Sequence, residues 1–205
     1  MGKTLYLECY SGISGDMTVA ALLDLGADHS VLDRVLKSLK VSGFETKISR
    51  VVKSGIDAYD FDVVLDKDHE NHDHDMEYLF GHDHTHLQED THHHAHEHVH
   101  EDGHTHEHHH EHRNLSDVIA IIDKTHMTEN ARALAVKIFT ILAQAEAKAH
   151  GTDINHVHFH EVGAIDSIAD IIAVSVCLDN LAVDEVCIPS MNEGCGTVRC
   201  QHGIL

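Results

Sequence analysis

The sequence predicts a mixed α/β fold, a small sheet with packed helices, interrupted by a disordered histidine-rich loop. Alternating apolar residues, typical of strands, occur within the first 65 residues, whereas apolar residues spaced three and four apart, typical of helices, dominate from residue 115 onward. Between these parts, residues 66–112 hold 18 of the 25 histidines and no apolar periodicity. We therefore expect a single α/β domain formed by residues 1–65 and 113–190, with residues 66–112 as an insertion.

The first part of the chain is expected to begin with a buried strand that runs into a turn of small residues. A short helix follows, and Ser30 is expected to cap a second helix whose apolar residues have helical spacing. Two alternating segments then flank Lys53-Ser54-Gly55, a pattern typical of a hairpin. The expected bounds are 4–10 for the strand, 17–25 for the first helix, and 44–52 and 56–65 for the hairpin.

Helices are expected to dominate after the insertion. Residues 115–123 predict a short helix, and Thr128 is expected to cap a long one that ends at Gly151. Residues 164–181 predict a third helix, apolar nearly all round and therefore deeply buried. Residues 186–188 predict a last strand. Residues 191–205 are interpreted as the start of a linker toward a C-terminal domain that this chain lacks.

The composition favours cations as partners. The formal net charge is −21, and residues 66–112 alone carry 14 acidic residues against one lysine. Such a chain repels phosphate backbones and anionic lipid, so we expect neither nucleic acid nor membrane as partners. The five cysteines are widely spaced and no signal peptide or membrane-length apolar run is present, which indicates a cytoplasmic protein.

The histidine-rich segment is expected to be disordered and to capture metal ions. Imidazole suits nickel, copper and zinc, and a mobile chain can wrap several rings around one ion. A loop without a role and a pH-responsive polyelectrolyte remain alternatives. Because copper binds such sites more tightly than nickel, the segment does not identify its ion, and we interpret it as a reservoir. Its candidate ligands are His82, His84, His86, His92, His93, His94, His96, His98, His100, His104, His106, His108, His109, His110 and His112.

The first ordered candidate site is the turn Ser11-Gly12-Ile13-Ser14-Gly15-Asp16-Met17 between a strand and a helix. Gly12, Ser14 and Gly15 let a ligand approach the backbone, and free amides at a helix start attract phosphate. Asp16 would then need a bridging divalent ion. In the alternative, the Asp16 carboxylate simply interacts with the helix dipole.

The second candidate site is His156-Val157-His158-Phe159-His160-Glu161 and the helix that follows. In an extended run, alternate histidines share one face, and Asp166 and Asp170 share one face of the helix. Buried carboxylates are costly unless something cationic pairs with them, so a metal or metal–nucleotide site is favoured. In the alternative, Asp166 caps the helix and the histidines are surface residues.

Together these motifs resemble the LarC family of nickel-insertion proteins. The resemblance spans the chain end to end, and the motif from His158 to Asp170 is long and ordered. Two departures are that Glu8 stands where relatives often have Asp, and that relatives continue with a Pro-rich sequence and a C-terminal domain. The matching segments are residues 11–17 with 22–26, the histidine-rich insertion after the hairpin, residues 158–170, and residues 194–198 before His202-Gly203.

The resemblance implies a nickel chelatase of the lyase class. Such an enzyme inserts Ni²⁺ into pyridinium-3,5-bisthiocarboxylic acid mononucleotide, making the nickel-pincer cofactor of lactate racemase. It consumes CTP with Mg²⁺ or Mn²⁺. The implied partners are the C-terminal LarC portion, lactate racemase and further copies of the full-length protein. We expect Asp16, Glu161, Asp166 and Asp170 to be catalytic and His158 and His160 to bind metal. A non-catalytic nickel store or metallochaperone is the alternative.

Overall fold

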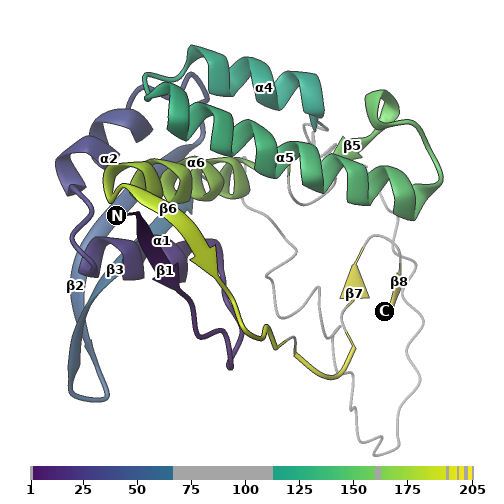
Figure 1. Cartoon of the computed structure of the whole chain (residues 1–205). Coiled ribbons are helices and arrows are strands. Elements are labelled where there is room, and N and C mark those ends of the chain that lie inside the picture. The colour runs from purple at the N-terminus through teal and green to yellow at the C-terminus, as the bar shows by residue number, and fades with distance from the viewer. Residues whose placement is uncertain are drawn as a thin grey trace, which may run out of the picture. The chain divides into compact units, whose positions relative to one another are not determined.

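The computed structural model describes residues 2–66, 113–159, 163–192, 194–197, 199–200 and 203–204. The described chain contains both helices and strands, interspersed along the sequence, so the predicted mixed α/β class is confirmed (Figure 1). The elements are β1 (Lys3–Tyr6), α1 (Gly15–Asp24), α2 (His29–Leu36), β2 (Phe44–Lys53), β3 (Ile56–Leu65), β4 (Arg113–Asn114), α4 (Leu115–Lys124), α5 (Glu129–His150), the 3-10 turn η2 (Ile154–His156), β5 (His158–Phe159), α6 (Ile165–Asn180), β6 (Val183–Cys187), β7 (Arg199–Cys200) and β8 (Gly203–Ile204).

The described residues up to 66 and from 113 to 195 form one compact unit. Described residues after 195 belong to a second unit, in which β7 and β8 pair as antiparallel strands. The histidine-rich insertion lies outside the described residues, so its predicted disorder stays a prediction. In the part of the chain that the structure describes, no helix is both long and apolar enough to cross a membrane.

The strands of the first unit pair two by two. β1 and β6 are parallel, β2 and β3 form the predicted antiparallel hairpin, and β4 pairs antiparallel with β5. The strand predicted over residues 4–10 is shorter than expected, because its regular pairing with β6 ends at Tyr6 and the chain then turns at Gly12, whose φ is +87°. Cys9 and Tyr10 form only isolated bridges.

Helix α6 is the centre of the core. It contacts α1, α2, α5, β3 and β6, and it lies among these elements in Figure 1. Eight of its 16 residues are buried, and Ile172 and Ala173 have no exposed surface. The deep burial predicted for this helix is therefore confirmed. The carboxylates near its first turns consequently lie between packed elements.

The helix ends follow local side-chain chemistry. Thr128 caps α5 as predicted, since its hydroxyl accepts the amide of Ala131, and Gly151 ends α5 in the left-handed conformation. The prediction that Ser30 caps α2 is wrong. Asp28 is the N-cap, and its carboxylate accepts the amide of Ser30 at 2.8 Å, which satisfies a free amide of the first turn.

Candidate functional site

The small-residue turn at residues 11–17 connects β1 to α1. Ser14 is the N-cap in an extended conformation, and it makes no side-chain cap to a helix amide. Its hydroxyl donates instead to Oδ1 of Asp16, in the first turn of α1. First-turn amides are left without the side-chain cap that would otherwise occupy them, so the turn can offer donors to an anion. One of these amides is already used, since the backbone amide of Asp16 donates to the Asp170 carboxylate.

Gly15 is where α1 and α6 approach most closely at this site. A Cβ at position 15 would lie 2.3 Å from Oδ2 and 2.7 Å from Cβ of Asp170. Any larger residue would therefore require the Asp170 side chain or one of the two helices to shift. The glycine that the sequence suggested as a backbone contact for a ligand serves, in this structure, to admit the Asp170 side chain beside the start of α1.

The Asp170 carboxyl lies in surroundings that disfavour its charged form. Burial is the largest cause, and the neighbouring carboxylates of Asp16, Asp166 and Asp62 add repulsion, so the pKa of Asp170 is raised to about 7. The backbone amide of Asp16 opposes this rise but does not cancel it. Oδ1 of Asp170 is buried without a hydrogen-bond partner. A carboxyl in this state can hold or release a proton near neutral pH.

Three elements therefore bring acidic side chains to one place, which we call the carboxylate cluster: Asp16 on α1, Asp62 on β3, and Asp166 and Asp170 on α6. The sequence predicted three of its members. It missed Asp62, because the alternation of the hairpin marks this position only as a polar residue of a strand, and nothing in the sequence shows that β3 passes the start of α6.

The start of α6 is fixed by contacts around Gly163. Nη1 of Arg113 donates to the Gly163 carbonyl at 2.9 Å, and a Cβ at Gly163 would lie 2.7 Å from Cβ of Phe159. Ala164 is the N-cap of α6, so the alternative interpretation, in which Asp166 caps this helix, is wrong. Its carboxylate does accept the amide of Ser167 at 2.8 Å, within the first turn.

The second motif is extended only after His156. Residues 154–156 form the 3-10 turn η2, capped by Asp153, so the expected extended run does not include His156. His156 and His158 are nevertheless both exposed, as expected, while Val157 and Phe159 are buried. Asp153 accepts the amide of Asn155, and this turn replaces extended backbone. His158 is exposed on β5. His160 and Glu161 lie outside the described residues, as do the candidate ligands between His82 and His112.

The oxygen donors of the carboxylate cluster match the preference of Mg²⁺ and Mn²⁺, and the unpartnered Oδ1 of Asp170 is one such donor. The carboxylates of the cluster are not arranged as a complete metal-binding site. Within the described ranges, no three His, Cys, Asp or Glu side chains are arranged to hold a metal ion. A divalent ion at the cluster would thus require the carboxylates to move toward it.

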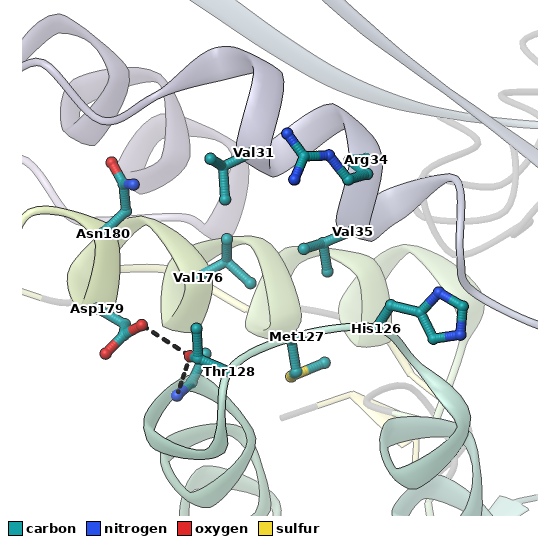
Figure 2. Close-up of a pocket in the computed structure, with 10 residues that line it drawn as sticks. Val31, Arg34, Val35, His126, Met127, Thr128, Val176, Asp179 and Asn180 are labelled. Atoms are coloured by element: carbon teal, nitrogen blue, oxygen red, sulfur yellow. Dashed lines mark hydrogen bonds between the residues drawn. The ribbon is translucent and has the colours of Figure 1, made fainter.

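A separate pocket of about 290 Å³ lies between α2, α6 and the segment joining α4 to α5 (Figure 2). Its polar groups hold the helices together. The hydroxyl of Thr128 donates to Asp179 at 2.7 Å, and Oδ1 of Asn180 accepts the amide of Asp28 at 2.8 Å. No predicted site residue lines this pocket, so the carboxylate cluster remains the candidate site.

Comparison with known proteins gives consistent matches. The family model described as nickel insertion protein matches residues 5–205. A pyridinium-3,5-bisthiocarboxylic acid mononucleotide nickel insertion protein of Alkaliphilus metalliredigens is 50% identical over 206 residues, covering 100% of this chain and 43% of the relative. Proteins of the same description from Clostridium acetobutylicum and Acetivibrio thermocellus are 47% and 39% identical, covering 99% of this chain in both and 47% and 42% of the relatives.

The chain thus spans less than half the length of these relatives. No solved structure matches it significantly. The family match covers the turn at residues 11–17, the carboxylates of α6 and the segment after β6 alike. Because the match runs over nearly the whole sequence, the chain belongs to the nickel insertion protein family.

Proposed function

We propose that this chain takes part in inserting Ni²⁺ into pyridinium-3,5-bisthiocarboxylic acid mononucleotide to form the nickel-pincer nucleotide. The observation that carries the proposal is the family match over residues 5–205, joined to relatives whose description names that substrate and that metal. Nickel is here the cargo of the reaction. Since the chain spans 43% of the Alkaliphilus metalliredigens relative, the complete reaction would also need residues beyond this span.

The carboxylate cluster is the part of the chain proposed to act in the reaction. Metal binding displaces protons from protonatable ligands, so an insertion site needs a group that accepts them. Asp170, with a pKa of about 7, would accept such a proton at neutral pH. Asp16 and Asp166 would tune this group through their charge, and the turn at Gly12, Ser14 and Gly15 would receive an anionic part of the nucleotide.

CTP dependence is a finer part of the same proposal, with Mg²⁺ or Mn²⁺ as the accompanying ion. Asp16 and Asp170 would supply its carboxylate ligands, and the ion would neutralise phosphate charge that these carboxylates otherwise repel. His158 and the segment containing His160 and Glu161 would handle the Ni²⁺ cargo, and the histidine-rich insertion would store it. In this proposal the chain belongs to a nickel chelatase of the lyase class that works in the cytoplasm and supplies lactate racemase.

The test is a reconstitution with matched variants. The chain, the C-terminal part of the Alkaliphilus metalliredigens relative, Ni²⁺, CTP, Mg²⁺ and the pyridinium mononucleotide are combined, and the nickel-containing nucleotide is measured by mass spectrometry. Asp16→Asn and Asp170→Asn should each lower the rate about a hundredfold, the scale of a lost acid–base group. Asp33→Asn, at an exposed ion pair with Lys37, is the control and should leave the rate unchanged.

Unchanged rates in both cluster variants would contradict the role of the carboxylate cluster. A nickel store or metallochaperone is the second candidate function, and the histidine-rich insertion favours it. In that case the chain would deliver Ni²⁺ to the C-terminal part, and neither CTP nor the cluster variants would affect the delivered amount. Omitting CTP from the reconstitution therefore separates the two functions.

A further inference from the structure

The pair β1–β6 forms an unusual surface. Parallel sheets are normally covered on both faces, since their strands are joined by helices that pack on them. Here seven of the nine residues of β1 and β6 are exposed. Tyr6 is 53% exposed and Val186 is 42% exposed, although both are large apolar residues. Figure 1 shows the two strands side by side at the surface of the first unit.

One edge of this sheet is open. The amide of Leu7 donates to the Cys187 carbonyl at 3.0 Å, so the odd-numbered residues of this segment point toward β6. Alternate residues of a strand point to opposite edges, and the backbone groups of Thr4 and Tyr6 therefore point away from β6. In the described part of the chain, the sheet holds only these two strands. The edge beyond β1 thus offers donors and acceptors that no other described strand pairs with.

An apolar groove lies beside the end of this strand. It has a volume of about 460 Å³ and is lined on one side by residues 5–9, of which Leu5 and Tyr6 belong to β1, and on the other by α1. Met17 on α1 is 57% exposed beside it, and Leu25, the C-cap of α1, is 60% exposed. An open strand edge with an apolar groove next to it is the surface to which an extended segment adds as a further strand. Its main lining residues are Leu5, Leu7, Ile13, Met17, Ala21 and Leu25.

We propose that an extended apolar segment of the nickel insertion protein, from the part that lies beyond the span of this chain, adds to the β1 edge and fills this groove. The reason for choosing this occupant is length: the chain covers 43% of the Alkaliphilus metalliredigens relative, so more than half of that protein is available to cover the surface. The proposal rests on the family assignment and is independent of the reaction.

The added segment would lie beside the candidate site. Gly12 and Ile13 line the groove and belong to the same turn as Ser14 and Asp16. A segment in the groove would therefore hold the turn in place and bring residues of its own next to the carboxylate cluster. This gives a physical reason why the chain alone would lack part of its site.

Hydrogen exchange on two intact proteins tests the proposal. Backbone amides of peptides covering residues 3–8 and 15–26 are compared between this chain and the matching peptides of the full-length Alkaliphilus metalliredigens relative. We expect exchange in the relative to be about tenfold slower or more in both peptides, because strand addition protects edge amides. Peptides from the tip of the β2–β3 hairpin, around Ser54 and Gly55, are the control and should exchange alike in the two proteins.

Paired substitutions give a second test that does not depend on exchange. Met17→Glu should change the melting temperature of this chain by less than about 2 °C, because the side chain is exposed, whereas glutamate at the matching position of the relative should lower its melting temperature by about 5 °C or more. Ile141, 55% exposed on α5, provides the matched control. Ile141→Glu and its counterpart should have equally small effects in both proteins.

Two results would overturn the proposal. The first is equal exchange of the β1 peptide in both proteins together with equally small effects of the two substitutions at position 17. The second is concentration-dependent dimerisation of this chain, measured by sedimentation, with protection of the β1 peptide appearing only in the dimer. That outcome would assign the edge to a second copy of the chain.

Discussion

Asp170 lies where α1, β3 and α6 meet, and the charge of its neighbours decides its chemistry. Its carboxyl is held near a pKa of about 7 by burial and then by repulsion from other carboxylates, and its Oδ1 has no hydrogen-bond partner. A buried polar group without a partner lowers the stability of the fold, so we expect Asp170 to have a function that explains why it is kept. Proton transfer or cation binding would both provide one.

Replacing Asp170 by Asn should stabilise the protein and remove part of its pH dependence. The folded-state pKa is raised from 3.8, so the unfolded chain loses the proton first, and the stability of the protein falls as the pH rises from about 4 to about 7. Asp170→Asn should raise the free energy of unfolding by about 2–4 kcal/mol at pH 8, and by less at pH 5. Urea unfolding at both pH values measures the difference.

The control is Asp153→Asn. Asp153 is the N-cap of the turn η2, and the hydrogen bond from the Asn155 backbone amide lowers its pKa, the opposite direction to Asp170. That variant should not stabilise the protein at pH 8. Equal free energies of unfolding for wild type and Asp170→Asn at both pH values would contradict the proposed burial of charge at Asp170.

At the scale of the elements, the sequence predicted what local chemistry decides. The cap at Thr128, the end of α5 at Gly151 and the hairpin around Gly55 follow from residue types whose side chains or backbone freedom act within one turn. The sequence predicts Ser30 as the cap of α2, although Asp28 is also a good cap. In the structure the Asp28 carboxylate accepts the amides of Ser30 and Val31, and the Asp28 amide donates to Asn180, a tertiary contact that no local pattern contains.

The candidate site shows the same limit. Asp166 and Asp170 could be placed on one helix face because helical spacing is local. Their approach to Asp16, and the part played by Asp62, depend on how α1 and β3 pack against α6, which no local pattern contains. The extended run expected from His156 begins only after that residue, because Asp153 favours a turn there, although His156 and His158 are both exposed as expected.

Thr128 provides a test of element packing. Its hydroxyl accepts the Ala131 amide at 3.2 Å and donates to Asp179 at 2.7 Å, so one side chain both caps α5 and ties it to α6 (Figure 2). Thr128→Ala should lower the free energy of unfolding by about 1–2 kcal/mol, as for other lost caps. Thr128→Ser keeps the hydroxyl and should cost less than half as much. Equal losses in the two variants would point to the methyl group instead of the cap.

At the scale of the whole molecule, the histidine-rich insertion and the carboxylate cluster occupy different parts of the sequence. The histidine-rich insertion connects β3 to β4, so it leaves the first unit where the hairpin ends and returns where α4 begins. The core of that unit is built from residues on either side of the insertion, including Phe61 on β3 and Val118 on α4. Gathering of nickel and the stability of the fold should therefore be separable properties of the chain.

Deleting residues 67–112 and joining the ends with a short Gly/Ser linker should separate them. Bound Ni²⁺, measured by equilibrium dialysis, should fall several-fold, because 18 of the 25 histidines are removed. The melting temperature should change by only about 2 °C or less, since the described residues on either side of the deleted segment form a buried core with one another. In the reconstituted reaction, product formation should drop at limiting nickel and recover at saturating nickel. Loss of activity that saturating nickel does not restore would mean that the insertion acts in the chemistry itself, and the reservoir role would have to be abandoned.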